Sequence, residues 1–299
     1  MEKKVDLSGI FPPIPTPFYK EEVDYDKLSL NVEKWSKIGL AGFVIFGSNG
    51  EYPYLSRREK LQTVKTVGQT APKSMTLIAG TGCESTRETL DLTNAGAEQG
   101  AHAALVVTPH YFGDKMTSAA LIKHYTTIAD RAAIPVLLYN VPKFTHINLT
   151  VEVVAELSRH PNIIGIKDSS GNVAQLGEYL NHVDKNFQVL VGMGSALFGA
   201  LTLGCSGGVL ALANIAPAAC VSIFNLVRKG EFTAARDLQL KMIPVNKAVT
   251  GTYGIAGLKA SMDLLGYYGG DPRPPLLPAS EKEKGEIKAI LATAGLLYL

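Results

Sequence analysis

Lys167 is placed where a lysine could act as a nucleophile. It follows the uncharged run Ile163–Ile166 and precedes Asp168. If that run is a buried strand, its apolar surroundings disfavour the ammonium form and leave an amine that can attack a carbonyl. The alternatives are a salt bridge with Asp168 or a lysine that reaches the surface. The position therefore predicts, without proving, Schiff-base chemistry.

Two other places have side chains suited to the same chemistry. Tyr139 also ends an apolar run, so its phenol could transfer protons beside Lys167, although a core aromatic is the alternative. Ser48 and Asn49 lie between Gly47 and Gly50, in a turn whose backbone N–H groups could converge on a carboxylate. A plain tight turn is the alternative there.

Other candidate groups carry a weaker signal. The six histidines show no metal-ligand spacing, so we predict no metal site. The glycine pairs Gly192/Gly194 and Gly207/Gly208 have no basic residue near them and indicate close packing rather than phosphate binding. Cys83 has no base nearby in the sequence and is predicted to be a small buried residue.

The chain repeats one structural pattern that could position these groups. Eight short apolar runs do not alternate with polar residues, which is typical of a parallel sheet covered on both faces. They are residues 10–18, 42–48, 76–82, 103–109, 135–142, 163–170, 188–195 and 207–214. Helical segments lie between them, and capping-box signatures at Ser56 and Ser85 mark two helix starts.

Eight such units predict an α/β fold, a (β/α)8 TIM barrel with extra C-terminal helices. A doubly wound open sheet is the alternative, but the turn at Gly47–Gly50 lacks the GxGxxG spacing of a dinucleotide site. We expect the barrel over residues 1–228 and a helical extension packed on it over 229–299. Prolines between 272 and 278 should delay the last helix until about Ser280.

Composition narrows the class of protein. Of 299 residues 46% are hydrophobic and 19% charged, with a net charge of +2, so a large core is expected and nucleic acid is not an expected partner. Three cysteines make no disulfide framework, and no leader is visible. We therefore predict a cytoplasmic protein, or a mitochondrial one if a transit peptide has been removed. Residues 186–227 carry no charge but contain glycines and a proline, which favours strand, helix, strand and helix over a membrane span.

Together, several motifs resemble one family of class I aldolases. They are GSNGE at 47–51, VVTPHYF at 106–112, LLYNVP at 137–142 and IIGIKDSSGN at 163–172. The chain resembles the dihydrodipicolinate synthase/N-acetylneuraminate lyase superfamily from its N-terminal PPIPTPF to its C-terminal GLKASMDLLGYYGGDPRPPL. GCEST and GGVLALAN look closest to the 4-hydroxy-2-oxoglutarate aldolase branch.

The resemblance implies a role for each matching residue. Lys167 would form the Schiff base with pyruvate, and Tyr139 would shuttle protons in a relay with Ser48. Tyr111 would complete that relay from across a subunit interface. Ser48 and Asn49 would hold the pyruvate carboxylate, and Val209 would offer its backbone carbonyl. The resemblance also implies a homotetramer built as a dimer of dimers, and a reaction without metal or organic cofactor.

Two departures from the resemblance concern the second substrate. The lysine-pathway synthases carry an arginine shortly after YNVP, where this chain has Phe144. Two residues later they usually carry a glycine, where this chain has His146. A distal carboxylate would then meet polar groups such as Asn49 and Ser169. We therefore predict cleavage of 4-hydroxy-2-oxoglutarate to pyruvate and glyoxylate. The alternatives are the dihydrodipicolinate synthase reaction, a sialic-acid lyase, a 2-keto-3-deoxy sugar acid aldolase or dehydratase, and a non-catalytic binding protein.

Overall fold

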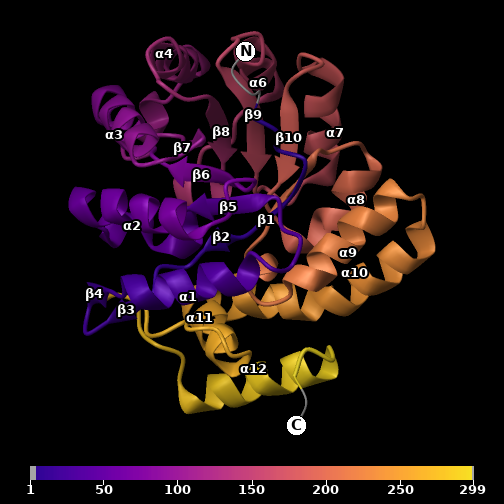
Figure 1. Ribbon diagram of the computed structural model, residues 1–299. Helices are drawn as coiled ribbons and strands as arrows, with labels where there is room; N and C mark the ends of the chain where they lie inside the picture. The colour runs from indigo at the N-terminus through magenta and orange to yellow at the C-terminus, as the bar shows by residue number, and fades with distance from the viewer. Residues whose placement is uncertain (1–4, 298–299) are drawn as a thin grey trace.

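Parallel strands form the centre of the protein. The computed structural model describes residues 5–297. Residues 1–4, the start of the segment in which no leader is visible, and residues 298–299 lie outside the described part. Seven strands follow one another around the sheet in chain order (Figure 1). They are β5 (Gly42–Ile45), β6 (Thr76–Gly80), β7 (Ala103–Val107), β8 (Val136–Asn140), β9 (Ile163–Asp168), β10 (Gln188–Val191) and β11 (Gly207–Val209).

The eighth strand of the barrel is split in two. Strand β1 (Gly9–Phe11) pairs with β11, and β2 (Pro13–Ile14) pairs with β5 on the other side. The run expected over residues 10–18 is therefore interrupted at Pro12, which has no N–H to donate to a neighbouring strand. Its carbonyl still accepts from Val44 N at 3.0 Å, so the two pieces join both edges of the sheet. The predicted (β/α)8 barrel is confirmed, although every other strand ends earlier than its apolar run.

Each strand is followed by a helix that covers the outer face of the sheet (Figure 1). The covering helices are α1 (Tyr25–Trp35), α2 (Arg57–Thr70), α3 (Thr86–Glu98), α4 (Ser118–Ala129), α6 (Val151–Leu157), α7 (Val173–His182), α8 (Leu197–Thr202) and α9 (Pro217–Arg228). Both halves of the capping box form at Ser56. At Ser85 the hydroxyl accepts from Glu88 N, and only that half of the predicted box is made.

The uncharged stretch 186–227 forms β10, α8, β11 and α9, as the sequence predicts. No helix among residues 5–297 is both long and apolar enough to span a bilayer.

The chain continues past the barrel as helices. These are α10 (Phe232–Lys247), a π-helical segment (Ala248–Thr252), α11 (Gly254–Leu264) and α12 (Glu281–Thr293), which begins after Ser280 as expected. Helix α10 packs on α9, and the segment after α11 lies on α1, where Tyr267 stacks on Trp35 at 5.3 Å. Figure 1 shows α11 and α12 below α1. The division at residue 228 remains a prediction.

The sheet separates two apolar cores. The larger core lies between the strands and the helices around them. The smaller one fills the barrel with side chains from successive strands, and Val44, Leu137, Tyr139, Leu190 and Val209 belong to it. A packed barrel interior leaves the carboxyl ends of the strands as the place where polar groups can meet.

Candidate active site

Lys167 points into the barrel. On β9 it pairs in register with Tyr139 of β8 and Leu190 of β10, and both belong to the inner core. Register partners in a sheet point to the same face, so the lysine does too. Only 3% of its surface is exposed. Its Nζ lies 4.0 Å from the centroid of the Tyr139 ring, and a Cβ added to Gly47 would lie 3.9 Å from that Nζ.

Asp168 faces the opposite side of the sheet from Lys167. Its carboxylate accepts hydrogen bonds from Asn140 at 2.6 Å, from Gln175 at 3.0 Å and from Ser170 N at 3.0 Å. Asp168 therefore belongs to a polar network between the sheet and α7. It does not pair with Lys167, which was the alternative considered from the sequence. This network anchors the end of β9 from outside the barrel.

Tyr139 connects Lys167 to the Ser48 turn. Its hydroxyl shares a 3.1 Å hydrogen bond with Ser48 Oγ. Burial alone would raise the pKa of the phenol. The positive charge of Lys167 and hydrogen bonds with Ser48, Lys167 and Ser169 outweigh this effect, and the pKa of Tyr139 is lowered from its ordinary value. A phenol in this setting is suited to proton transfer.

The Ser48–Asn49 turn is a short 3-10 helix, Ser48–Gly50, that follows β5. Gly47 is packed against the first strand, because a Cβ there would lie 3.1 Å from Pro13 Cβ. Thr16 Oγ1 donates to Gly50 O at 2.7 Å. The turn is therefore held to the barrel at both ends, with Ser48 directed at Tyr139 and Asn49 half-buried beside it.

Ser169 directly follows β9 and is one of the groups that lower the pKa of Tyr139, which brings it into the same cluster. A Cβ on Gly192 would come within 2.0 Å of Ser169 Oγ, so this glycine makes room for the serine. A Cβ on Gly207 would meet Gly9 O at 1.9 Å. Close packing, the predicted role of these glycines, is confirmed at both positions.

Two predicted residues contribute less directly. Val209 is buried in the inner core with Tyr139, and the role of its carbonyl stays a prediction. Tyr111 is 78% exposed and packs edge-on against Phe112 at 5.0 Å between ring centroids. Its backbone N–H donates to Glu84 at 2.9 Å. Within one chain Tyr111 does not join the cluster, and its role across a subunit interface stays a prediction.

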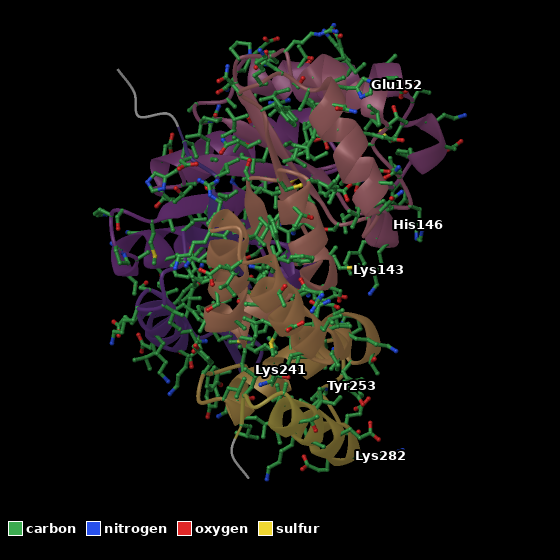
Figure 2. The ribbon with its side chains drawn as sticks, turned by 90° about the vertical axis from the view of Figure 1, so that its right-hand side faces the viewer. Lys143, His146, Glu152, Lys241, Tyr253 and Lys282 are labelled. Carbon is green, nitrogen blue, oxygen red and sulfur yellow. The ribbon has the colours of Figure 1, made fainter. Side chains whose placement is uncertain are left out.

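The loop after β8 carries Phe144 and His146, the two departures from the family resemblance, and both are exposed. Phe144 is 52% exposed, and Lys143 Nζ donates to Thr250 O at 3.0 Å, bridging the loop to the π-helical segment. Figure 2 shows Lys143 between His146 and the C-terminal helices. His146 has a φ of 56° at the end of the short helix α5 (Pro142–Thr145). Glycine adopts that left-handed conformation without strain, which fits the glycine that the family resemblance implies at this position.

Cys83 lies apart from the lysine cluster. Its Sγ lies 3.0 Å from the Tyr52 hydroxyl, and burial raises the pKa of the thiol. Cys83 is half-buried rather than fully buried as predicted, and a raised pKa makes its thiol a weaker nucleophile.

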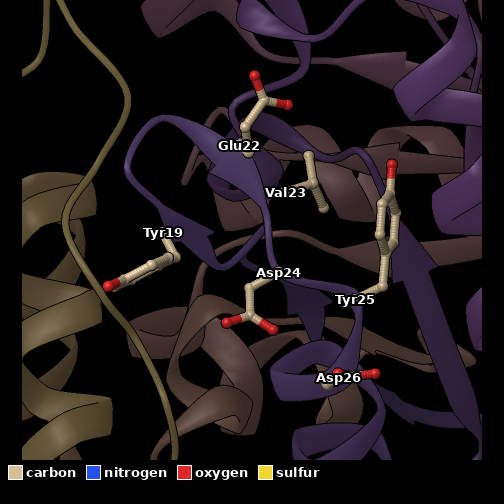
Figure 3. Close-up of a pocket in the computed structure, with 6 residues that line it drawn as sticks. All are labelled: Tyr19, Glu22, Val23, Asp24, Tyr25 and Asp26. Atoms are coloured by element: carbon tan, nitrogen blue, oxygen red, sulfur yellow. The ribbon is translucent and has the colours of Figure 1, made fainter.

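A surface hollow lies over the β3 (Phe18–Tyr19) and β4 (Glu22–Val23) hairpin and the start of α1 (Figure 3). It is lined by Tyr19, Glu22, Val23, Asp24, Tyr25 and Asp26. Its three carboxylates would repel an anionic 2-oxo acid. The barrel mouth, with its lysine, remains the candidate site for such a substrate.

Sequence reasoning missed the importance of Glu51, which it treated only as part of the GSNGE motif. Its carboxylate is buried and lies 2.6 Å from Lys259 Nζ, on the C-terminal helix α11. A lysine inside the apolar segment 254–262 is the one local signal that a buried partner exists.

Comparison with known proteins places this geometry in a class. The sequence profile of the dihydrodipicolinate synthetase family matches residues 6–294. The 4-hydroxy-tetrahydrodipicolinate synthase of Methanothrix thermoacetophila is 36% identical over 285 residues, which is 95% of each chain. The chloride-inhibited dihydrodipicolinate synthase of Acinetobacter baumannii, solved with pyruvate, is 32% identical with a TM-score of 0.93. That match covers 97% of this chain and all of the other.

The family match and the fold place the chain among carbon–carbon lyases of the class I aldolase type. Within that class, the chain belongs to the dihydrodipicolinate synthetase family. The superfamily prediction is therefore confirmed. These relatives carry the synthase name rather than that of the 4-hydroxy-2-oxoglutarate aldolase, so they support the synthase alternative better than our narrower prediction.

Proposed function

We propose that the chain is a pyruvate-dependent lyase in which Lys167 forms an imine with the ketone of a 2-oxo acid. One observation carries this proposal: the buried Lys167 amine lies 4.0 Å from the ring of Tyr139, whose hydroxyl is hydrogen-bonded to Ser48. Ser48 and Asn49 would bind the carboxylate next to that ketone.

The arrangement suits a retro-aldol reaction. The Lys167 amine adds to the C2 carbonyl, and Tyr139 donates its proton to the oxygen that leaves as water. The product is an iminium that accepts the electrons of the C3–C4 bond. Tyr139 takes the proton of the C4 hydroxyl as that bond breaks, and the aldehyde departs. The resulting enamine is protonated at C3, and water releases pyruvate and the free lysine.

For the substrate we propose 4-hydroxy-2-oxoglutarate, cleaved to pyruvate and glyoxylate. No guanidinium stands at position 144, and the ammonium of Lys143 is engaged by Thr250 O. The second carboxylate of a five-carbon diacid would reach Ser169 at the barrel mouth, while Asn49 stays with the carboxylate next to the ketone.

The second candidate is the synthase reaction, the condensation of pyruvate with aspartate semialdehyde. The names of the relatives favour it, since the 33–36% identical proteins described as 4-hydroxy-tetrahydrodipicolinate synthases match 95% of this chain. It would share Lys167 and Tyr139 and differ only in the groups that meet the distal end of the substrate. A sugar-acid lyase or a non-catalytic binder has no comparable observation behind it.

The test compares kcat/KM for the five-carbon diacid with kcat/KM for pyruvate and aspartate semialdehyde. A higher value for the diacid supports our choice, and a higher value for the semialdehyde establishes the synthase reading. Borohydride reduction in the presence of pyruvate is the control common to both, because each requires an adduct on Lys167. Absence of any adduct would remove both.

We also propose a homotetramer and a cytoplasmic location. Among similar structures, one 29% identical protein with a TM-score of 0.92 is described as a monomeric dihydrodipicolinate synthase variant. Sedimentation equilibrium would measure the state of this chain.

A further inference from the structure

Glu51 closes the Ser48–Asn49 turn in a conformation that a glutamate rarely adopts. Its φ of 55° and ψ of 36° are left-handed, and it is the last residue of the GSNGE motif. A non-glycine residue in this region is disfavoured unless its surroundings hold it there. Whatever holds Glu51 therefore also sets the backbone that presents Ser48 and Asn49.

The C-terminal segment supplies that hold. Glu51 Oε1 lies 2.6 Å from Lys259 Nζ, and both side chains are fully buried. Glu51 Oε2 accepts a 2.7 Å hydrogen bond from Arg273 N, 222 residues away in sequence. Both carboxylate oxygens are thus engaged from outside the barrel.

Lys259 is itself fixed by several contacts. Its Nζ donates to Asp271 O at 3.0 Å and lies 4.5 Å from the centroid of the Phe18 ring. The Arg273 guanidinium lies 4.4 Å from the same ring. A buried ion pair is weak evidence for stability, because removing both ions from water costs much of what their attraction contributes. A role in fixing one conformation therefore has to be tested directly.

We propose that the Glu51–Lys259 pair is a positioning device for the substrate-carboxylate turn, through which α11 controls the placement of Ser48 and Asn49. Neither residue touches the substrate. The inference rests on the proposed function only in taking the turn to bind the carboxylate of a 2-oxo acid.

A neighbouring ion pair provides a matched control. Arg273 also binds Glu59 of α2, with 2.6 Å between Nη2 and Oε1. That pair docks the same C-terminal segment but contacts α2 instead of the turn. Glu59→Gln should therefore weaken docking without moving Ser48.

The experiment measures the pyruvate concentration that half-saturates borohydride trapping on Lys167, for folded protein at one temperature. The test variant is Glu51→Gln/Lys259→Met, which removes both charges and nearly keeps the volumes, so no unpaired ion stays buried. We expect the half-saturating concentration to rise about tenfold or more, as for the loss of one hydrogen bond to a charged group. Glu59→Gln should leave it unchanged.

A second measurement is the pH dependence of trapping. A displaced Ser48 would lose its hydrogen bond to Tyr139, one of the contacts that lower the pKa of that phenol. The part of the profile that reports Tyr139 should therefore move to higher pH in the double variant and stay in place in Glu59→Gln.

Each outcome decides between the two roles of the pair. A folded double variant that traps pyruvate as the wild type does overturns the positioning role. If the double variant does not fold, Glu51→Gln/Lys259→Gln carries the test, because its two neutral amides can hydrogen-bond to each other and an acceptor remains for Arg273 N. Failure of both to fold assigns the pair to folding and also overturns the proposal. A wild type that traps no pyruvate would instead refute the proposed function.

Discussion

Lys167 and Tyr139 are register partners on neighbouring parallel strands, and the amine of one lies 4.0 Å from the ring centroid of the other. Two side chains paired in this way are fixed by the backbone hydrogen bonds of the sheet rather than by a loop. Their relative position thus has the rigidity of the barrel, which suits a nucleophile and a proton carrier that act on the same substrate carbon skeleton.

Replacing the nucleophile should abolish catalysis without unfolding the protein. Lys167→Arg keeps the positive charge, but a guanidinium forms no imine with a ketone. We expect no turnover and no borohydride-stable pyruvate adduct by mass spectrometry, with circular dichroism near that of the wild type. An adduct on a different lysine would end the Schiff-base assignment.

Removing the phenol hydroxyl should affect turnover more than pyruvate binding. Tyr139→Phe deletes the proton carrier and the hydrogen bond to Ser48, and keeps the ring beside Lys167. We expect kcat to fall about 10²- to 10⁴-fold, the usual contribution of a general acid–base group. Near-wild-type kcat would reduce Tyr139 to a packing residue.

Restoring the synthase arginine should shift the substrate preference. Phe144 is half exposed, so Phe144→Arg fits without repacking the core. We expect kcat/KM for pyruvate with aspartate semialdehyde to rise relative to that for the five-carbon diacid by about tenfold. Phe144→Leu controls for the loss of the ring. An unchanged ratio in Phe144→Arg would show that this loop does not contact the distal carboxylate.

The room that Gly192 leaves for Ser169 can be closed by one methyl group. Gly192→Ala would put a Cβ 2.0 Å from Ser169 Oγ and 2.9 Å from Asp168 O. In our proposal Ser169 binds the distal end of the diacid, which pyruvate lacks. We therefore expect KM for the diacid to rise by a larger factor than the pyruvate concentration that half-saturates trapping. Gly285→Ala on α12, where a Cβ meets nothing within 4 Å, is the matched control. Equal losses in both measurements would contradict a distal role for Ser169.

Acid should weaken the docking of the C-terminal segment through Glu59. Hydrogen bonds from Arg273, opposed by burial and helped by Ser56, lower the pKa of Glu59 from 4.5 to about 2. The unfolded chain therefore binds this proton first as pH falls, so the contribution to stability is complete above pH 4.5 and is lost as pH falls toward 2.

The measurement is urea unfolding of the wild type and Glu59→Gln between pH 7 and pH 3. We expect the variant to be less stable at pH 7, and the difference to narrow as pH falls below 4.5. A constant difference across this range would show that the Glu59 charge is not what Arg273 recognises.

The repeating architecture and the Lys167–Tyr139 pair could be predicted from the residue pattern alone. Apolar runs such as residues 163–166 reveal buried strands because burial on both faces demands a continuous apolar pattern. The placement of Lys167 and Tyr139 was predictable because a polar side chain at the carboxyl end of a buried barrel strand lies at the barrel mouth. The start of α12 near Ser280 was predictable because the prolines between 272 and 278 prevent a helix from forming earlier, which is a local effect.

Contacts between distant parts of the chain could not be predicted in this way and became visible in the folded structure. The local sequence reveals neither that Glu51 is the partner of Lys259 nor that Gly192 leaves space for Ser169. Each depends on which segments the closed barrel brings side by side. Charge pairing and steric room are properties of that juxtaposition, because a side chain's environment is set by spatial neighbours that the spacing of residues along the chain does not reveal.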